Sequence, residues 1–165
     1  MKKAFTLIEL LIGFALVGLL MATGIVLLFT SLRTAKKASA VGTAKTEGAY
    51  ALNTLSQKIR YAQSVSCPAS PPNSVTVNFF GGTTTVYRLS SGKLAASGAS
   101  TADLTTSRVV VDSSGCPGGT FTCSPAVSPT KVTICFNVNL AGVTDVNETG
   151  KAAFQSQVSL RNAGN

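Results

Sequence analysis

The spacing of apolar residues divides the chain into two parts. Residues 10–32 contain no charged side chain and are rich in long aliphatic residues. A helix rises about 1.5 Å per residue, so this run is long enough to cross a hydrocarbon core of roughly 30 Å. It is longer than the apolar region of an ordinary secretory signal, which spans about 7 to 15 residues. The pattern therefore predicts a membrane-spanning helix near the N-terminus.

The helix is expected to continue beyond this run. Residues 33–65 contain no proline and many Ala, Lys, Gln and Leu residues, all compatible with helix. Seven residues that recur at intervals of three and four positions form an amphipathic stripe along this helix, and such a stripe can pack on a sheet. Its members are Val41, Lys45, Gly48, Leu52, Leu55, Ile59 and Ala62. The sequence Ser66-Cys67-Pro68 predicts the end of the helix, at about Val65.

Beyond Pro72 the apolar period changes to two, which is typical of strands. Strands are expected at residues 75–80, 83–89, 93–96, 108–112, 131–140 and 153–162, with a polar connection at 97–107 and a loop at 113–129. In the clearest strand Val132, Ile134, Phe136 and Val138 share one face, so Cys135 points to the other. The expected fold class is α+β, with a long helix packed on an antiparallel β-sheet head.

The chain has four cysteines, Cys67, Cys116, Cys123 and Cys135. An even number in a small domain behind an export-type N-terminus predicts two disulfides and an oxidising compartment. A zinc site is disfavoured, because the sequence has no Cys-x-x-Cys and no histidine. Loop length favours Cys116–Cys123 with Cys67–Cys135. Cys67–Cys116 with Cys123–Cys135 is the next alternative.

The chain is strongly basic, with a formal net charge of +8. From Arg33 onward there are 12 Lys/Arg and 5 Asp/Glu residues, so this part is about +7 (12 − 5). Since no Arg/Lys cluster is interleaved with aromatic residues, we interpret this charge as a solvated basic surface. With no histidine, no phosphate-binding glycine loop and no nucleophile–base set, the sequence predicts neither an enzyme nor a bound cofactor.

Glu9 is the unexpected residue of the apolar segment. A carboxylate at the centre of a bilayer costs about 2.5–3.5 kcal/mol on insertion scales, and less near an interface. Glu9 is either tolerated at the cytoplasmic edge or paired with a specific cation. Lys2 and Lys3 lie just before it and favour a cytoplasmic N-terminus, although Arg33, Lys36 and Lys37 directly after the run weaken that asymmetry.

The stretch Lys2-Lys3-Ala4-Phe5-Thr6-Leu7-Ile8-Glu9-Leu10-Leu11-Ile12-Gly13 resembles the processing and methylation motif of type IV prepilins and of type II secretion pseudopilins. The resemblance implies cleavage between Ala4 and Phe5 and N-methylation of Phe5. Ala4 departs from the family, which usually has glycine before the cut. It also implies that Glu9 of one subunit pairs with the Phe5 amine of a neighbour during filament assembly.

The resemblance divides the chain into four parts and implies its partners. Residues 1–4 are the leader, 5–32 the transmembrane and filament-core helix, 33–65 its amphipathic continuation, and 66–165 a disulfide-bonded head outside the cytoplasm. The implied partners are other pilin or pseudopilin subunits, prepilin peptidase, an inner-membrane assembly platform, and membrane lipid before assembly. The precursor is expected to cross the inner membrane once, with its C-terminus outside, and then to enter a periplasmic or cell-surface filament.

Two stretches of the head, residues 87–94 and 158–162, also resemble the globular parts of minor pilins and minor pseudopilins. Some major pseudopilins bind calcium in a loop, but the spacing of acidic residues in 145–150 matches no calcium-loop pattern, so we interpret it as a polar turn and expect no metal. The leading interpretation is a minor pilin or minor pseudopilin. A DNA-binding competence pilin and a plain single-pass membrane protein that keeps its leader remain alternatives.

Overall fold

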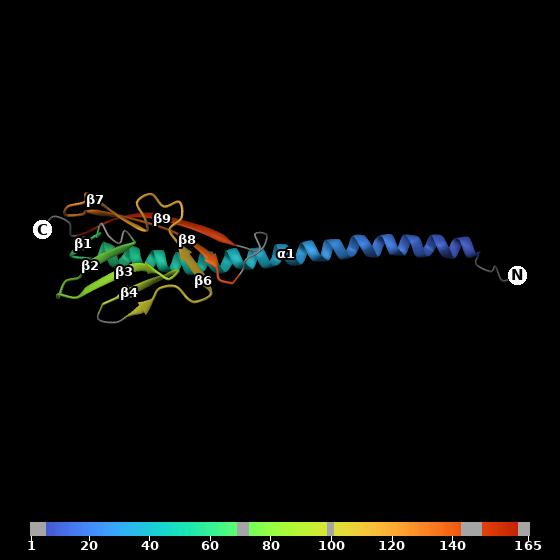
Figure 1. The fold of residues 1–165 in the computed structure, drawn as a ribbon, viewed down its shortest axis with the longest axis horizontal. Helices are drawn as coiled ribbons and strands as arrows, with labels where there is room; N and C mark the ends of the chain where they lie inside the picture. The colour runs from blue at the N-terminus through green and yellow to red at the C-terminus, as the bar shows by residue number, and fades with distance from the viewer. Residues whose placement is uncertain (1–5, 69–72, 99–100, 143–149, 162–165) are drawn as a thin grey trace.

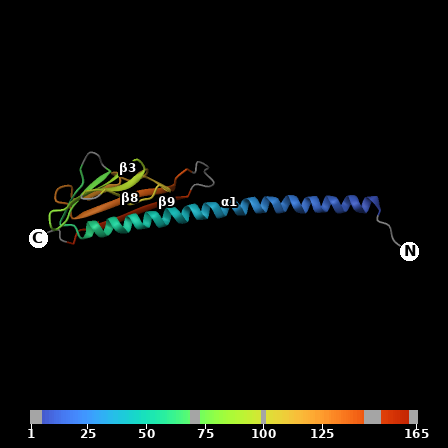
Figure 2. The ribbon, with the colours of Figure 1, turned by 90° about the horizontal axis from the view of Figure 1, so that it is seen from below.

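The chain forms one long helix, and its C-terminal part carries a head of two β-sheets. The computed structural model describes residues 6–68, 73–98, 101–142 and 150–161. The first half of the helix projects from the head as a bare rod, and both sheets lie alongside the second half (Figure 1). Figure 2 shows the sheets on one side of the helix only.

The helix α1 spans Leu7–Arg60, with 54 residues, and is therefore roughly 80 Å long. Thr6 caps its N-terminus, where its side chain accepts a hydrogen bond from the backbone N–H of Glu9. Tyr61 caps the C-terminus, and its N–H donates to the carbonyl of Gln57. The predicted end at about Val65 was too late by several residues. Ser64–Ser66 instead forms strand β1, because its backbone pairs with β2.

The first sheet is an antiparallel meander of five strands in sequence order. Its strands are β1 (Ser64–Ser66), β2 (Ser74–Asn78), β3 (Thr84–Ser90), β4 (Lys93–Ser97) and β5 (Ala102–Asp103). The strands predicted at residues 75–80 and 83–89 are confirmed as β2 and β3, which pair as a hairpin, and both glycines of its turn, Gly81 and Gly82, have positive φ. The two-residue β5 lies within the segment that was expected to be a polar connection only.

The second sheet is built around β8 (Lys131–Leu140), which is the strand that the apolar alternation predicted. β9 (Lys151–Ser159) pairs along one edge of β8. The other edge is shared end to end by β6 (Val109–Asp112), opposite the last residues of β8, and β7 (Phe121–Ser124), opposite the first. The sequence prediction of an unbroken loop at 113–129 was therefore wrong, because Phe121 gives β7 a buried anchor on β8.

The head has one hydrophobic core, to which the helix and both sheets contribute. The four alternate residues predicted to share one face of β8 are fully buried. On α1 the buried residues are Ala40, Ala44, Gly48, Ala51, Leu55 and Ile59. Of the predicted stripe, Gly48, Leu55 and Ile59 are buried, Val41 and Leu52 are half-buried, and Ala62 is buried just beyond the helix. Lys45 is exposed, and Ala44 is buried in its place.

Two glycines allow the helix and β9 to approach closely. A Cβ atom on Gly48 would overlap the ring of Phe154 in β9, which stacks on Phe136 with the ring centroids 5.4 Å apart. A Cβ on Gly150, just before β9, would lie 2.8 Å from the carbonyl carbon of Ala40 in the helix backbone. Small residues on both elements therefore set the distance between the helix and the sheet.

Candidate functional site

The projecting half of α1 is apolar and packs against no other part of the described residues. From Leu7 to Leu32 every large hydrophobic side chain is exposed, with Leu7 at 79% and Phe14 at 69%. By length and composition, α1 is a helix that could cross a membrane. An exposed apolar surface of this size is strongly unfavourable in water, so lipid or other protein chains must cover it.

Glu9 lies at the N-terminal end of this exposed half. The Thr6 hydroxyl donates a 3.4 Å hydrogen bond to a Glu9 carboxylate oxygen, while the backbone N–H of Glu9 donates to the same hydroxyl oxygen. The bond from the Glu9 N–H is the first half of a capping box, whereas the Glu9 carboxylate contacts the Thr6 hydroxyl and lies at the positive end of the helix dipole. Glu9 also borders a small apolar groove with Leu10, Gly13, Phe14 and Val17. The predicted processing residues, Ala4 and Phe5, lie outside the described residues.

The four cysteines form two disulfides, with a connectivity that the sequence did not predict. Cys67 is bonded to Cys123, and Cys116 to Cys135. The favoured pairs, Cys116–Cys123 and Cys67–Cys135, are therefore wrong, as is the next alternative. The number of disulfides was predicted correctly, and none of the cysteines is free.

The pairing of the strands explains this connectivity. Because β6 and β7 pair with the same edge of β8, the segment between them must pass beside the middle of β8, where Cys135 lies. The Cys135 N–H donates to the carbonyl of Thr120 in that segment, and the Cys116 disulfide fastens the same segment. Cys123 in β7 is left at the outer edge of this sheet, where it meets Cys67 directly after β1 of the other sheet.

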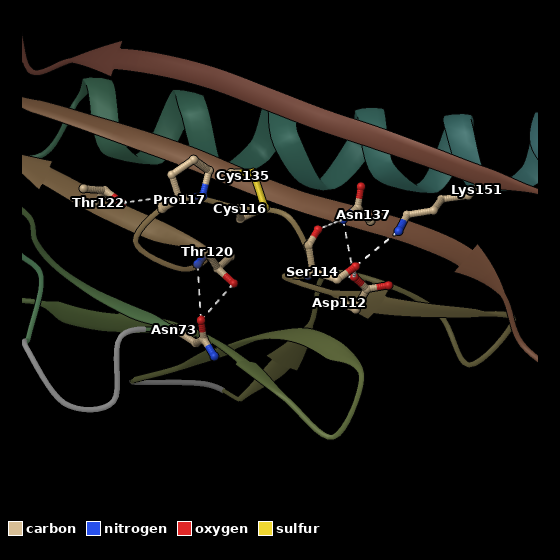
Figure 3. The surroundings of a disulfide bond; sticks show 10 residues. All are labelled: Asn73, Asp112, Ser114, Cys116, Pro117, Thr120, Thr122, Cys135, Asn137 and Lys151. Atoms are coloured by element: carbon tan, nitrogen blue, oxygen red, sulfur yellow. Dashed lines mark hydrogen bonds between the residues drawn. A yellow bond between two sulfur atoms is a disulfide. The ribbon is translucent and has the colours of Figure 1, made fainter.

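A polar network surrounds the Cys116–Cys135 disulfide at the end of β6 (Figure 3). The Ser114 N–H donates to Asp112 Oδ1 over 2.8 Å, and Asn139 Nδ2 donates to Asp112 Oδ2 over 2.8 Å. Asn137 Nδ2 donates to both Asp112 Oδ1 and the carbonyl of Ser114, and Lys151 Nζ lies 3.2 Å from the Ser114 hydroxyl. The network orders the start of the disulfide-bearing segment.

The network also determines the charge state of Asp112. Partial burial alone would raise the pKa of this carboxyl, but the hydrogen bonds from Ser114 and Asn137 and the nearby charge of Lys151 lower the pKa below its usual value. The carboxylate is therefore held in its ionised form.

The segment between β6 and β7 also contacts the residue that precedes β2 of the first sheet. Both the N–H and the hydroxyl of Thr120 in this segment donate to Asn73 Oδ1.

Within the described residues, no group of three His, Cys, Asp or Glu side chains is arranged to hold a metal ion. The polar turn considered as a calcium loop, residues 145–150, lies outside the described residues except for Gly150. An open groove of about 530 Å³ lies between α1 and the β5–β6 connection, lined by Glu47, Tyr50, Lys93 and Asp103 among others. Glu47 accepts hydrogen bonds from Thr106, and Lys93 pairs with Asp103 at 2.9 Å, so its charged groups are already satisfied.

Sequence reasoning missed the Asp112 network, although a signal for it was present. An aspartate followed two residues later by serine, at the end of a strand, is typical of a turn in which the side chain caps the backbone. The asparagines of β8 that complete the network gave no such signal, because their approach to Asp112 depends on the register of β6 and β8.

The comparisons with known proteins concern the N-terminal segment. Residues 1–25 match the family model of the prokaryotic N-terminal methylation motif. Neither the curated proteins nor the solved structures gave a match. The motif implies processing by prepilin peptidase and assembly with other pilin subunits, and it indicates a structural subunit. Together with the exposed apolar helix it fits an inner-membrane anchor that also serves a filament. The methylation motif, the long N-terminal helix and the antiparallel head thus support the type IV pilin and pseudopilin family for this chain.

Proposed function

We propose that this chain is a minor pilin or minor pseudopilin, which enters a type IV pilus-like or type II secretion filament through the exposed half of α1. The observation that carries the proposal is the exposure of every large apolar side chain from Leu7 to Leu32, on a helix whose first residues match the methylation motif. Such a helix needs lipid before assembly and the equivalent helices of neighbouring subunits afterwards.

In the proposed mechanism, prepilin peptidase removes residues 1–4 by cleaving between Ala4 and Phe5. The new α-amine of Phe5 is then methylated and carries a positive charge. The single-pass precursor keeps its head, with its two disulfides, outside the cytoplasm. Residues 5–32 form the membrane anchor and later the filament core, while the helix beyond residue 33 carries the head of residues 66–165. The inner-membrane assembly platform would extract the subunit from lipid.

Glu9 has a specific part in this proposal. Both its carboxylate and the Phe5 amine of a neighbouring subunit are unfavourable in an apolar environment, and pairing them relieves both costs and fixes the axial register. The capping contact with Thr6 supports this role, because it holds the carboxylate at the very end of the helix, where a neighbouring N-terminus can reach it.

The test uses Glu9→Ala and Glu9→Gln in cells that assemble the filament. We expect both variants to insert into the inner membrane like the wild type, but to be incorporated into filaments less often, as measured by quantitative immunoblotting of sheared filaments. Thr6→Ser, which keeps the capping hydroxyl, is the matched control and should assemble normally. Normal incorporation of Glu9→Ala would refute the pairing, and mass spectrometry showing an intact Met1 would refute the proposed maturation.

A further inference from the structure

Two cations that directly follow the apolar run, Arg33 and Lys37, lie on one face of α1. We call them the basic pair. They are four residues apart in a continuous helix and are therefore neighbours on its surface. Lys37 lies three residues before Ala40, the first residue of the stripe that the head buries, so the basic pair continues the helix face that packs on the sheets. Unlike that stripe, both members of the pair are exposed.

The basic pair lies between the apolar run and the head. The run ends at Leu32, and the buried stripe begins at Ala40. At about 1.5 Å per residue, Arg33 lies roughly 2 Å and Lys37 roughly 8 Å beyond the run, whereas the head begins at roughly 12 Å. The headgroup region of a bilayer is about 5 to 8 Å thick on each side. When residues 10–32 span the membrane, both cations therefore lie at the depth of the headgroups.

Neither cation of the basic pair has a carboxylate partner among the described residues. Glu9 lies at the opposite end of the apolar run. The other three carboxylates of the described residues are in the head, and each already accepts hydrogen bonds there: Glu47, Asp103 and Asp112. A second copy of the chain, inserted to the same depth, would thus bring no unpaired carboxylate of the described residues to the basic pair.

The helix surface beside the basic pair has room for a headgroup. An open groove of about 480 Å³ runs along α1 from the residue that follows Arg33, and it is lined by Thr34, Lys37, Ala38, Val41, Gly42 and Lys45. Three of the lining residues are small, and a Cβ placed on Gly42 would have no neighbour within 4 Å among the described residues. A bulky polar group can therefore approach the Lys37 ammonium without displacing another side chain.

From this placement we propose that the basic pair binds the headgroup phosphate of an anionic phospholipid, in the leaflet that faces the head. Side chains four residues apart have Cβ atoms about 5–6 Å from each other, so the guanidinium and the ammonium can reach one phosphate. Cations after the span oppose the orientation that Lys2 and Lys3 favour, and contact with an anionic lipid offsets that effect. For these two residues the proposal replaces the sequence-based interpretation of a solvated basic surface.

This inference rests on the membrane-spanning role that we propose for α1, but it does not rest on filament assembly. A soluble polyanion is a poor alternative ligand, because both cations lie within the headgroup layer and below the first contact of the head with the helix. Lipid phosphates are the anions present at that depth.

The test measures lipid binding to the full-length protein in detergent micelles by native mass spectrometry. Phosphatidylglycerol, which is anionic, and phosphatidylcholine, which has no net charge, are the two probes. Each basic residue near an anionic lipid surface contributes about a fivefold gain in affinity, so we expect phosphatidylglycerol to bind about 25-fold more tightly than phosphatidylcholine. Arg33→Ala combined with Lys37→Ala should make the two affinities nearly equal. Arg33→Lys combined with Lys37→Arg keeps both charges and should retain the preference.

A matched control separates the basic pair from the overall charge of the chain. Arg88→Ala combined with Lys131→Ala removes two exposed cations from strands of the head, and this protein should prefer phosphatidylglycerol as strongly as the wild type. The unfolding midpoint of each variant shows that the head is intact. Inorganic phosphate in large excess should not displace phosphatidylglycerol, because the proposed ligand is a lipid and not a free phosphate.

Several results would overturn the inference. They are equal affinity of the wild type for the two lipids, equal loss of preference in the two double-alanine proteins, and displacement of phosphatidylglycerol by inorganic phosphate. An unchanged lipid preference of Arg33→Ala/Lys37→Ala, together with reduced incorporation into filaments, would assign the basic pair to a neighbouring subunit instead. Carbonate extraction of cell membranes separates these results from a failure of the proposed function. A chain that is extracted has no membrane anchor, which overturns both proposals, whereas an anchored chain without lipid preference overturns this inference alone.

Discussion

The two halves of α1 belong to one continuous helix but relate to their surroundings in opposite ways. The first half, from Leu7 to Leu32, is rich in Leu, Ile, Val and Phe, and its large side chains are exposed. The second half, from Ala40 to Arg60, is far less hydrophobic, yet it buries a stripe made mainly of alanine and glycine.

This difference shows that hydrophobicity and burial are separate properties within a single chain. Large side chains on the first half present area that only lipid or other chains can cover. Small side chains on the second half let the helix backbone lie close to β9. The contact between helix and sheet therefore depends on close packing and not on large apolar side chains of the helix. The first half is therefore built for association and the second for rigid attachment of the head.

The largest expected effect comes from a core ring that supports the second half. Phe136→Ala removes a fully buried ring and should lower the free energy of unfolding of the head by about 3–5 kcal/mol. Phe14→Ala, in the first half, should change this free energy by less than about 0.5 kcal/mol, because the Phe14 ring is exposed in the part of the chain that the structure describes. Urea unfolding of both full-length variants in micelles, followed by near-ultraviolet circular dichroism, measures this contrast. Similar losses in the two variants would contradict the division of the helix into two roles.

The two disulfides provide the next comparison. The Cys67–Cys123 disulfide joins the two sheets and connects residues 56 positions apart, whereas the Cys116–Cys135 disulfide connects residues 19 positions apart within the second sheet and its β6–β7 segment. Chain entropy predicts losses of about 4 and 3 kcal/mol when each pair is replaced by serine. Unfolding free energies of the two double-serine proteins measure the order. Tryptic mapping without reduction checks the connectivity itself, and a Cys116–Cys123 peptide would contradict the Cys67–Cys123 and Cys116–Cys135 pairing.

A pair of glycines in α1 tests the close approach of helix and sheet. Gly48→Ala places a methyl group against Phe154 and should lower the free energy of unfolding by about 1–3 kcal/mol. Gly42→Ala is the matched control, since a Cβ there has no neighbour among the described residues, and it should raise helix stability by about 0.5–1 kcal/mol. Equal and favourable effects in both would mean that Phe154 does not lie on Gly48.

The smallest effect is expected from the Asp112 network, which belongs to the head alone. Since the folded pKa of Asp112 lies below its unfolded value, its contribution to stability is present above the unfolded pKa and is lost as the pH falls through the folded pKa. Asp112→Asn should therefore reduce the difference between the thermal unfolding midpoints at neutral and at strongly acidic pH. Thermal unfolding midpoints from neutral pH to about pH 2 measure it. If Asp112→Asn has the same pH dependence as the wild type, the Asp112 carboxylate does not stabilise the folded head.

Much of the fold follows from local patterns in the sequence. The long apolar run predicted the first half of α1, and the alternation at Val132, Ile134, Phe136 and Val138 predicted the buried face of β8. Both predictions succeed because helix and strand periods are properties of a few neighbouring residues. The end of the helix was placed too late, since Ser64–Ser66 is taken into a strand by a partner that is distant in sequence.

The candidate site divides in the same way. The sequence by itself determined the methylation motif, Glu9 at the start of the apolar helix, and the even set of cysteines, because each is defined by residue identity and short spacing. Only the tertiary structure decided which cysteines bond and which residues order the Cys116 segment. The physical reason is that β6 and β7 share one edge of β8 and α1 ends beside the end of β9, and such long-range pairings are fixed by the packing of the whole head.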